Sequence, residues 1–278
     1  MTKNQKIFSI LLVLILIIAV FAWTKKTSSP IENTPVATST PIVIDETNTP
    51  APITPPATST PITPPVTSPP PATSTPTVTV PPEIWKLPGN TKRVSFTFDG
   101  GAGNHSHDEI IAILKKHNLK STYFLTGKWA TLNPEAVREM RDEGHEIFNH
   151  TYNHPELTKL GEADIQNELS SAEDAIKSIT GVTTKPYFRA PYGDRNAQVL
   201  KVAAQSGYQH IYWTIDAWDW RPGWTEETVK ARILDNLAPG NIYLMHIGDD
   251  ITGNILDEVF TEIKARGYTI VPLTEGLK

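Results

Sequence analysis

Residues 94–117 read VSFTFDGGAGNHSHDEIIAILKKH, and this stretch decides the fold. Residues 94–98 form a short apolar run typical of a β-strand, and residues 108–117 follow with four aliphatic side chains at helical spacing. A polar, glycine-rich loop that begins at Asp99 joins the two. A strand followed by an amphipathic helix is the repeating unit of a parallel sheet, so this stretch indicates an α/β domain.

The same alternation continues to the end of the sequence. Further strands are predicted at 122–125, 146–148, 187–188, 209–215, 242–245 and 269–271, with helices at 134–142, 163–179, 197–206, 225–236 and 255–266. These make about seven β/α units, so we predict an α/β fold, a distorted (β/α)7-type barrel, rather than an open doubly wound sheet. No GxGxxG or GxxxxGK[ST] loop is present, which leaves nucleotide chemistry without support.

The N-terminal residues 1–26 form a separate, membrane-directed segment. Between residues 7 and 23 the only polar side chain is Ser9, and lysines flank the block on both sides. The sequence Ala19-Val20-Phe21-Ala22 is a poor signal-peptide cleavage site. We therefore expect a signal peptide or N-terminal membrane anchor at 1–26 and favour the uncleaved anchor.

Residues 27–83 have the composition of a linker. They consist mainly of Thr, Pro, Ser, Ala and Val and hold 16 of the 24 prolines of the chain. So little apolar surface cannot offset the entropy of ordering the chain. We predict a disordered, extended spacer at 27–83, followed by a catalytic domain at 84–278.

Charge and cysteine content exclude several classes of function. The chain has no cysteine, which rules out disulfides, thiolate zinc sites and a cysteine nucleophile. The expected domain carries 21 basic and 26 acidic residues. Because nucleic-acid binding needs a basic face, we expect no nucleic-acid partner.

Polar residues follow the predicted strands where barrel enzymes place their chemistry, at the carboxyl ends. One such residue would carry little weight, but they recur in consecutive units. They are Asp99, His150, His154, Arg189, Asp216, Asp219 and His246. This recurrence predicts an active site at one end of the barrel.

These residues lie in five ordered motifs that resemble those of the polysaccharide deacetylases of the NodB type, also called carbohydrate esterase family 4. The resemblance covers residues 91–278, and its motifs are Thr97-Phe98-Asp99, His150-Thr151-Tyr152-Asn153-His154, Arg189-Ala190-Pro191-Tyr192, Asp216-Ala217-Trp218-Asp219-Trp220 and Leu244-Met245-His246. The family fold is a distorted (β/α) barrel. The resemblance implies hydrolysis of an acetamide on a sugar, which requires an activated water, a base, an acid and a group that stabilises the oxyanion.

The resemblance also implies a role for each catalytic residue. Asp99 would be the base that takes a proton from water, and Arg189 would orient it. His246 would be the acid that protonates the leaving nitrogen. Asp219 would hold His246, with Asp216 as the alternative partner.

Two aromatic residues are predicted to contact substrate. Tyr192 occupies the family position whose backbone N–H faces the oxyanion. Trp220 belongs to a dense group of tryptophans and adjoins Asp219, so it is a candidate for stacking on a sugar ring. Trp213, which lies within a predicted strand, is as readily a core residue.

The expected cofactor is a divalent metal ion, with zinc as our choice, held by His150 and His154. The family pattern supplies a second aspartate after Asp99 as a further ligand, but Gly100 stands here. Three arrangements stay open: Asp99 is itself the third ligand, a neighbour among His105, His107 and Asp108 replaces the missing one, or the metal site is weak. We hypothesise that Gly100→Asp strengthens zinc binding.

We therefore predict an extracellular hydrolase that removes N-acetyl groups from an amino-sugar polysaccharide. Peptidoglycan is the expected substrate because of the membrane segment and the spacer, and a cell-surface or secreted location is expected for the same reason. Chitin-like oligomers and xylan are alternative substrates. A wall-tethered glycan-binding module of weak or no activity is the alternative function.

Overall fold

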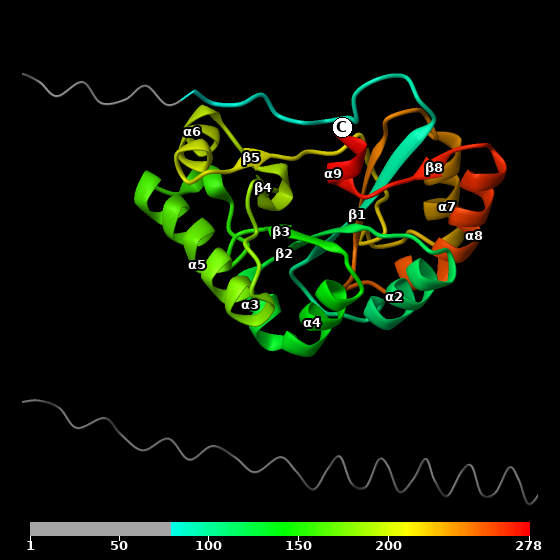
Figure 1. Ribbon diagram of the computed structural model, residues 1–278, viewed down its shortest axis with the longest axis horizontal. Coiled ribbons are helices and arrows are strands. Elements are labelled where there is room, and N and C mark those ends of the chain that lie inside the picture. The colour runs from blue at the N-terminus through cyan, green and yellow to red at the C-terminus, as the bar shows by residue number, and fades with distance from the viewer. Residues whose placement is uncertain (1–78) are drawn as a thin grey trace, which may run out of the picture. The chain divides into compact units, whose positions relative to one another are not determined.

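The computed structural model describes residues 79–278 (Figure 1). The expected anchor or signal segment at 1–26 and most of the expected linker at 27–83 lie outside these residues. Within the described part, no helix is long and apolar enough to cross a membrane. Glu83, the last residue of the expected linker, already contacts the folded part, because its carboxylate lies 2.7 Å from Arg195 Nε.

Strands and helices alternate along the chain. The strands are β1 (Arg93–Gly100), β2 (Thr122–Leu125), β3 (Glu146–Asn149), β4 (Tyr187–Phe188), β5 (Gln209–His210), β6 (Ile215–Asp216), β7 (Ile242–His246) and β8 (Thr269–Ile270). The helices are α2 (His107–Lys116), α3 (Gly127–Leu132), α4 (Pro134–Asp142), α5 (Glu162–Thr180), α6 (Ala197–Gln205), α7 (Glu226–Asp235), α8 (Thr252–Ala265) and α9 (Leu273–Gly276). Two short 3-10 turns lie at Leu157–Lys159 and Pro191–Gly193.

The strands form one curled sheet in the order β5-β4-β3-β2-β1-β7-β6, with β8 beside β1, and every pairing is parallel. Helices lie along the outer side of this curve (Figure 1). No pairing joins β5 to β6 among the described residues; Ile84 instead bridges to Ile211 and Lys86 to Asn241. The domain is thus an α/β fold with a curled parallel sheet, consistent with the distorted barrel that we expected.

Successive side chains of the central strand β1 point to opposite faces of the sheet, one of which faces the core and the other the site. Phe96 stacks on Tyr243, with ring centroids 4.6 Å apart, and meets Phe260 of α8 edge-on at 5.0 Å. Thr97 and Asp99 point to the opposite side of the sheet, where both bind Arg189. Because the apolar face of β1 packs against the helices outside the sheet, its polar face is held on the inner side of the curled sheet.

The structure differs from the predicted elements at 209–215, at the start of α8, and at two short helices that were not predicted, α3 and α9. The single strand predicted at 209–215 is divided into β5 and β6, because β5 pairs with β4 whereas β6 pairs with β7. Helix α3 was not predicted, since it is short and begins at a glycine. Helix α8 begins at Thr252, three residues before the predicted start.

Candidate active site

A cavity of about 620 Å³ opens beside the carboxyl ends of the strands. Its wall includes seven of the residues predicted from the motifs: Asp99, His150, His154, Tyr192, Asp216, Trp220 and His246. Two others, Arg189 and Asp219, are almost completely buried and reach the cavity through their partners. Residues predicted from separate strands are thus brought to one place.

Asp99 is a buried carboxylate paired with Arg189. Arg189 Nη1 donates to Asp99 Oδ1 at 2.6 Å, and His150 Nε2 lies 3.4 Å from Oδ2. Burial alone would raise the pKa of Asp99, but the positive charge of Arg189 above all outweighs it and holds that pKa below its usual value. Asp99 is therefore ionised at neutral pH, the state that a general base requires.

Arg189 has no exposed surface, and each end of its guanidinium is held. Nη2 donates to Thr97 Oγ1 at 3.0 Å and to the carbonyl of Tyr212 at 3.2 Å. The ring of Phe124 lies 4.1 Å from its central carbon. These contacts fix the orientation of the guanidinium, and through it that of the Asp99 carboxylate.

His246 ends β7 and pairs with Asp219. Asp219 Oδ1 lies 2.8 Å from His246 Nδ1, and Oδ2 accepts the backbone N–H of His246 at 2.6 Å. Burial alone would lower the pKa of His246, but Asp219 above all raises it to about 9. Asp216 instead accepts from Trp218 N at 3.0 Å. The structure thus pairs His246 with Asp219 rather than Asp216, and leaves the imidazole protonated at neutral pH.

Exposed aromatic side chains border the cavity. Tyr192 has a left-handed backbone with φ of 59°, is 69% exposed, and packs its ring edge-on against His154 at 4.5 Å. Trp220 is 54% exposed and lies 6.4 Å from the His246 ring. Trp213 also lines the cavity and stacks on Tyr212 at 3.9 Å. Trp218 instead packs against Trp224.

The two histidines proposed as metal ligands lie side by side, with ring centroids 4.9 Å apart. His150 Nδ1 lies 2.9 Å from the carbonyl of Arg189, so Nδ1 carries the proton and the lone pair of Nε2 faces Asp99. Burial lowers the pKa of His150, and burial lowers that of His154 to about 4. Both imidazoles are therefore neutral, as metal coordination requires.

No third ligand joins His150 and His154 in a tight group within residues 79–278. Asp99 is engaged by Arg189, and His105 lies 3.1 Å from Asp250. The one group of metal-binding type among these residues is a separate set, His107, Asp108 and Glu139, in which His107 Nε2 lies 3.1 Å from Glu139. The residues present thus fit a metal held by two imidazoles.

The glycines after Asp99 differ in what a side chain would meet. A Cβ at Gly100 would lie 2.7 Å from methyl carbons of both Leu125 and Ile247, in the apolar layer. A Cβ at Gly101 would lie 3.4 Å from His154 Cδ2 and 3.8 Å from its Nε2. The vacant side-chain position that lies next to His154 is therefore that of Gly101.

Three polar residues of the site were not predicted from the sequence. Thr97 accepts from Arg189 and donates to the Tyr243 carbonyl at 2.6 Å. Thr252 donates to Asp219 Oδ2 at 2.7 Å, and Asp249 lines the cavity. Thr97 lies two residues before Asp99 and therefore on the same face of the strand, so the sequence could have predicted that it lies near the site. Thr252 and Asp249 carry no such signal, because a loop places them.

A curled α/β sheet with an ionised carboxylate and a protonated imidazole at its carboxyl edge indicates an enzyme of the barrel type. Comparison with known proteins gives the family. Residues 86–211 match the family model described as "Polysaccharide deacetylase". A peptidoglycan-N-acetylmuramic acid deacetylase of Bacillus subtilis is 35% identical over 187 residues, which cover 65% of this chain and 70% of that protein. The chain therefore belongs to the polysaccharide deacetylase family, which includes hydrolases that act on amide bonds.

Two further relatives differ in activity. A peptidoglycan-N-acetylglucosamine deacetylase of Bacillus cereus is 34% identical over 190 residues, 67% of this chain and 68% of that protein. The crystal structure of a CE4 family pseudoenzyme from Bacillus anthracis is 31% identical, with a TM-score of 0.68 over 71% of this chain and 69% of that one. A mutant of that pseudoenzyme has restored enzymatic activity. The family thus includes both active and inactive proteins close to this one.

Proposed function

We propose that this protein removes N-acetyl groups from an amino-sugar polysaccharide, and that peptidoglycan is its substrate. The observation that carries the proposal is the pairing of β1 with β7, in which Asp99 and His246 are direct neighbours. An ionised carboxylate and a protonated imidazole then border one cavity, as attack by water and departure of an amine require. The relatives that act on peptidoglycan support this choice of substrate.

In the proposed mechanism, Asp99 accepts a proton from the attacking water while Arg189 keeps its carboxylate turned toward the cavity. The water oxygen bonds to the acetamide carbon, and the carbonyl oxygen takes up negative charge beside the backbone of Tyr192. His246 then donates its proton to the nitrogen, the carbon–nitrogen bond breaks, and acetate and a free amine leave. Asp219 stabilises the imidazolium before this transfer.

His150 and His154 would hold the divalent ion, with zinc as our choice. A bound ion supplies Lewis-acid polarisation of the carbonyl and lowers the pKa of a bound water. The chain's own contribution is to keep both imidazoles neutral and to hold His150 through the Arg189 carbonyl. Asp99, which Arg189 engages, is assigned to proton transfer rather than to the ion.

The proposed location is the cell surface, with the apolar block at residues 7–23 as anchor and the proline-rich segment as spacer. Such a tether would hold the domain within reach of wall glycans. A secreted form with a cleaved signal is the alternative. The spacer is long enough, at about 3.1 Å per residue, to span on the order of 150 Å.

Acetate release by the full-length protein tests this function. Purified peptidoglycan, N-acetylglucosamine oligomers and acetylated xylan are offered in parallel, each with and without a chelator. We expect release from peptidoglycan above the other two, with loss on chelation and recovery on addition of zinc. Release from xylan alone would contradict the proposed substrate class, and release unaffected by chelation would contradict the metal.

A glycan-binding module of weak or no activity is the second candidate, favoured by Gly100 and by the similarity to a pseudoenzyme. Both candidates predict binding to wall glycan. They differ in turnover, because a module would bind peptidoglycan and release no acetate with zinc present. Binding and acetate release measured on the same sample therefore separate them.

We predict that an aspartate at position 101 strengthens zinc binding more than one at position 100. Gly101→Asp points its carboxylate at His154, whereas Gly100→Asp must first displace Leu125 and Ile247. A third ligand should tighten zinc binding by about tenfold or more. The measurement is calorimetric zinc titration in a Glu139→Gln background, which disables the separate histidine and carboxylate group.

The two variants serve as controls for each other, since they add the same charge one residue apart. Equal or greater tightening by Gly100→Asp would assign the ligand position to residue 100. If neither variant changed the affinity for zinc, the hypothesis that the site lacks a carboxylate ligand would be contradicted. Melting temperatures of both should be measured, because we expect only Gly100→Asp to destabilise the fold.

A further inference from the structure

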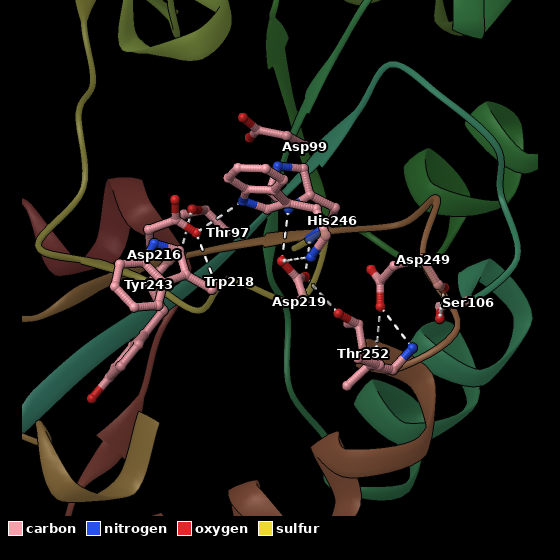
Figure 2. A network of polar contacts seen from close by, with 12 residues as sticks. Thr97, Asp99, Ser106, Asp216, Trp218, Asp219, Tyr243, His246, Asp249 and Thr252 are labelled. Carbon is pink, nitrogen blue, oxygen red and sulfur yellow. Dashed lines mark hydrogen bonds and ion pairs between the residues drawn. The ribbon is translucent and has the colours of Figure 1, made fainter. Parts of the chain in front are cut away.

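A second layer of polar contacts lies behind the Asp219–His246 pair (Figure 2). Asp219 accepts four hydrogen bonds: Oδ1 from the His246 ring and from Trp220 N, and Oδ2 from His246 N and from the hydroxyl of Thr252. Thr252 is completely buried and is the first residue of α8. Its hydroxyl, 2.7 Å from Oδ2, therefore helps to set the plane of the carboxylate.

Asp249 in turn holds Thr252 in place. Its Oδ1 accepts the backbone N–H groups of Ile251 and Thr252, each at 2.7 Å, and so caps the first turn of α8. The carbonyl of Asp249 accepts from Ser106 Oγ at 2.5 Å, and the same oxygen of Ser106 accepts from Gly253 N. The loop between β7 and α8 is thus held at Asp249 and at the start of α8, and Thr252 with it.

The remaining oxygen of Asp249, Oδ2, is buried without a hydrogen-bond partner in the described part of the protein. A buried carboxylate oxygen without a partner is costly, so it is not explained by stability alone. Burial above all, together with the negative charge of Asp219, raises the pKa of Asp249 to about 6. Above that pH, Asp249 places a second negative charge beside the pair.

We propose that Asp249 and Thr252 are positioning residues that act through Asp219 on His246. The proposal rests on the proposed role of His246 as the acid. Thr252 orients the Asp219 carboxylate so that Oδ1 meets the imidazole, and Asp249 fixes Thr252 and adds charge behind it. His246 then presents its other ring nitrogen to the cavity.

The two residues should affect the imidazole in opposite directions. Donation from Thr252 spreads the negative charge of Asp219, so its removal leaves Asp219 more basic and stabilises the imidazolium. Removal of the Asp249 charge destabilises the imidazolium. The other groups that face His246 are common to both variants: Asp99, Asp216, His150 and His154. Opposite shifts cannot arise from a general loosening of the loop.

The test uses the full-length protein with Thr252→Val, Thr252→Ser, Asp249→Asn and, as a matched control, Asp250→Asn. Asp250 is the next residue, is 86% exposed and pairs with His105 instead. We measure the pH dependence of kcat/KM and, by NMR, the titration of the His246 ring. Activity is lost as pH rises through the pKa of His246. We expect Thr252→Val to move this loss to higher pH and Asp249→Asn to move it to lower pH.

We also expect kcat/KM at the optimum to fall about tenfold or more in Thr252→Val, because this change removes the hydroxyl that donates to the Asp219 carboxylate. Thr252→Ser keeps the hydroxyl and should restore the wild-type profile. Shifts in the same direction, or shifts no larger than that of Asp250→Asn, would overturn the proposal. The NMR titration needs no turnover, so it decides the positioning role even if no glycan is deacetylated.

Discussion

We expect Asp99→Asn to lower kcat for acetate release by about 10³-fold, in the range that a general base contributes. Asparagine keeps the size of the side chain and leaves an oxygen to accept from Arg189 Nη1. What it removes is the ability to take a proton from water at the position next to His246. The loss should therefore appear in kcat, with little change in KM.

The control for this prediction is Asp235→Asn, which neutralises an exposed carboxylate at the end of α7. It should leave kcat unchanged. Because Asp99→Asn also removes the countercharge of buried Arg189, rates must be expressed per folded molecule, as judged by a melting curve. Retention of a tenth or more of the wild-type kcat by the folded variant would exclude Asp99 as the base.

The fold was largely predictable because its local signals agree with its packing. Strand β1 has an apolar run and α2 has aliphatic residues at helical spacing. The side chains that make these two patterns are the ones buried in the core. The division of 209–215 into two strands was not predictable. The first part of the segment, β5, pairs with β4, and the second part, β6, pairs with β7. This change of partner strand does not alter the hydrophobic periodicity of the sequence.

The site was predictable only where chemistry and strand ends coincide. Asp99, Arg189 and His246 each end or follow a strand within a motif, so their convergence could be expected. Thr252 and Asp249 act through a loop and a helix start whose geometry depends on Ser106, far away in sequence. Such contacts follow from tertiary packing, and a sequence pattern cannot specify them.

We expect Arg189→Met to destabilise the domain by about 3–5 kcal/mol, the usual cost of breaking a buried ion pair by removing one partner. Methionine fills much of the volume but leaves Asp99 charged and buried, and it leaves Thr97 and the Tyr212 carbonyl without their donor. Arg189→Lys should not restore stability, since one ammonium cannot serve partners on both ends of the guanidinium. The free energy of unfolding in urea measures the effect, with Arg138→Met on the surface of α4 as the control.

The pH dependence and a double variant separate this pair from simple loss of packing. Because the pKa of Asp99 is lowered from 3.8 in the folded protein, its pairing contributes stability above that pH, and the contribution is lost as pH falls through the lowered value. In Arg189→Met the unpaired Asp99 takes up a proton more readily, so the deficit should shrink as the pH falls toward 4. Adding Asp99→Asn should recover part of the loss at pH 7. A deficit independent of pH, or additive effects of the two changes, would show that Arg189 stabilises the fold by packing and not by its charge.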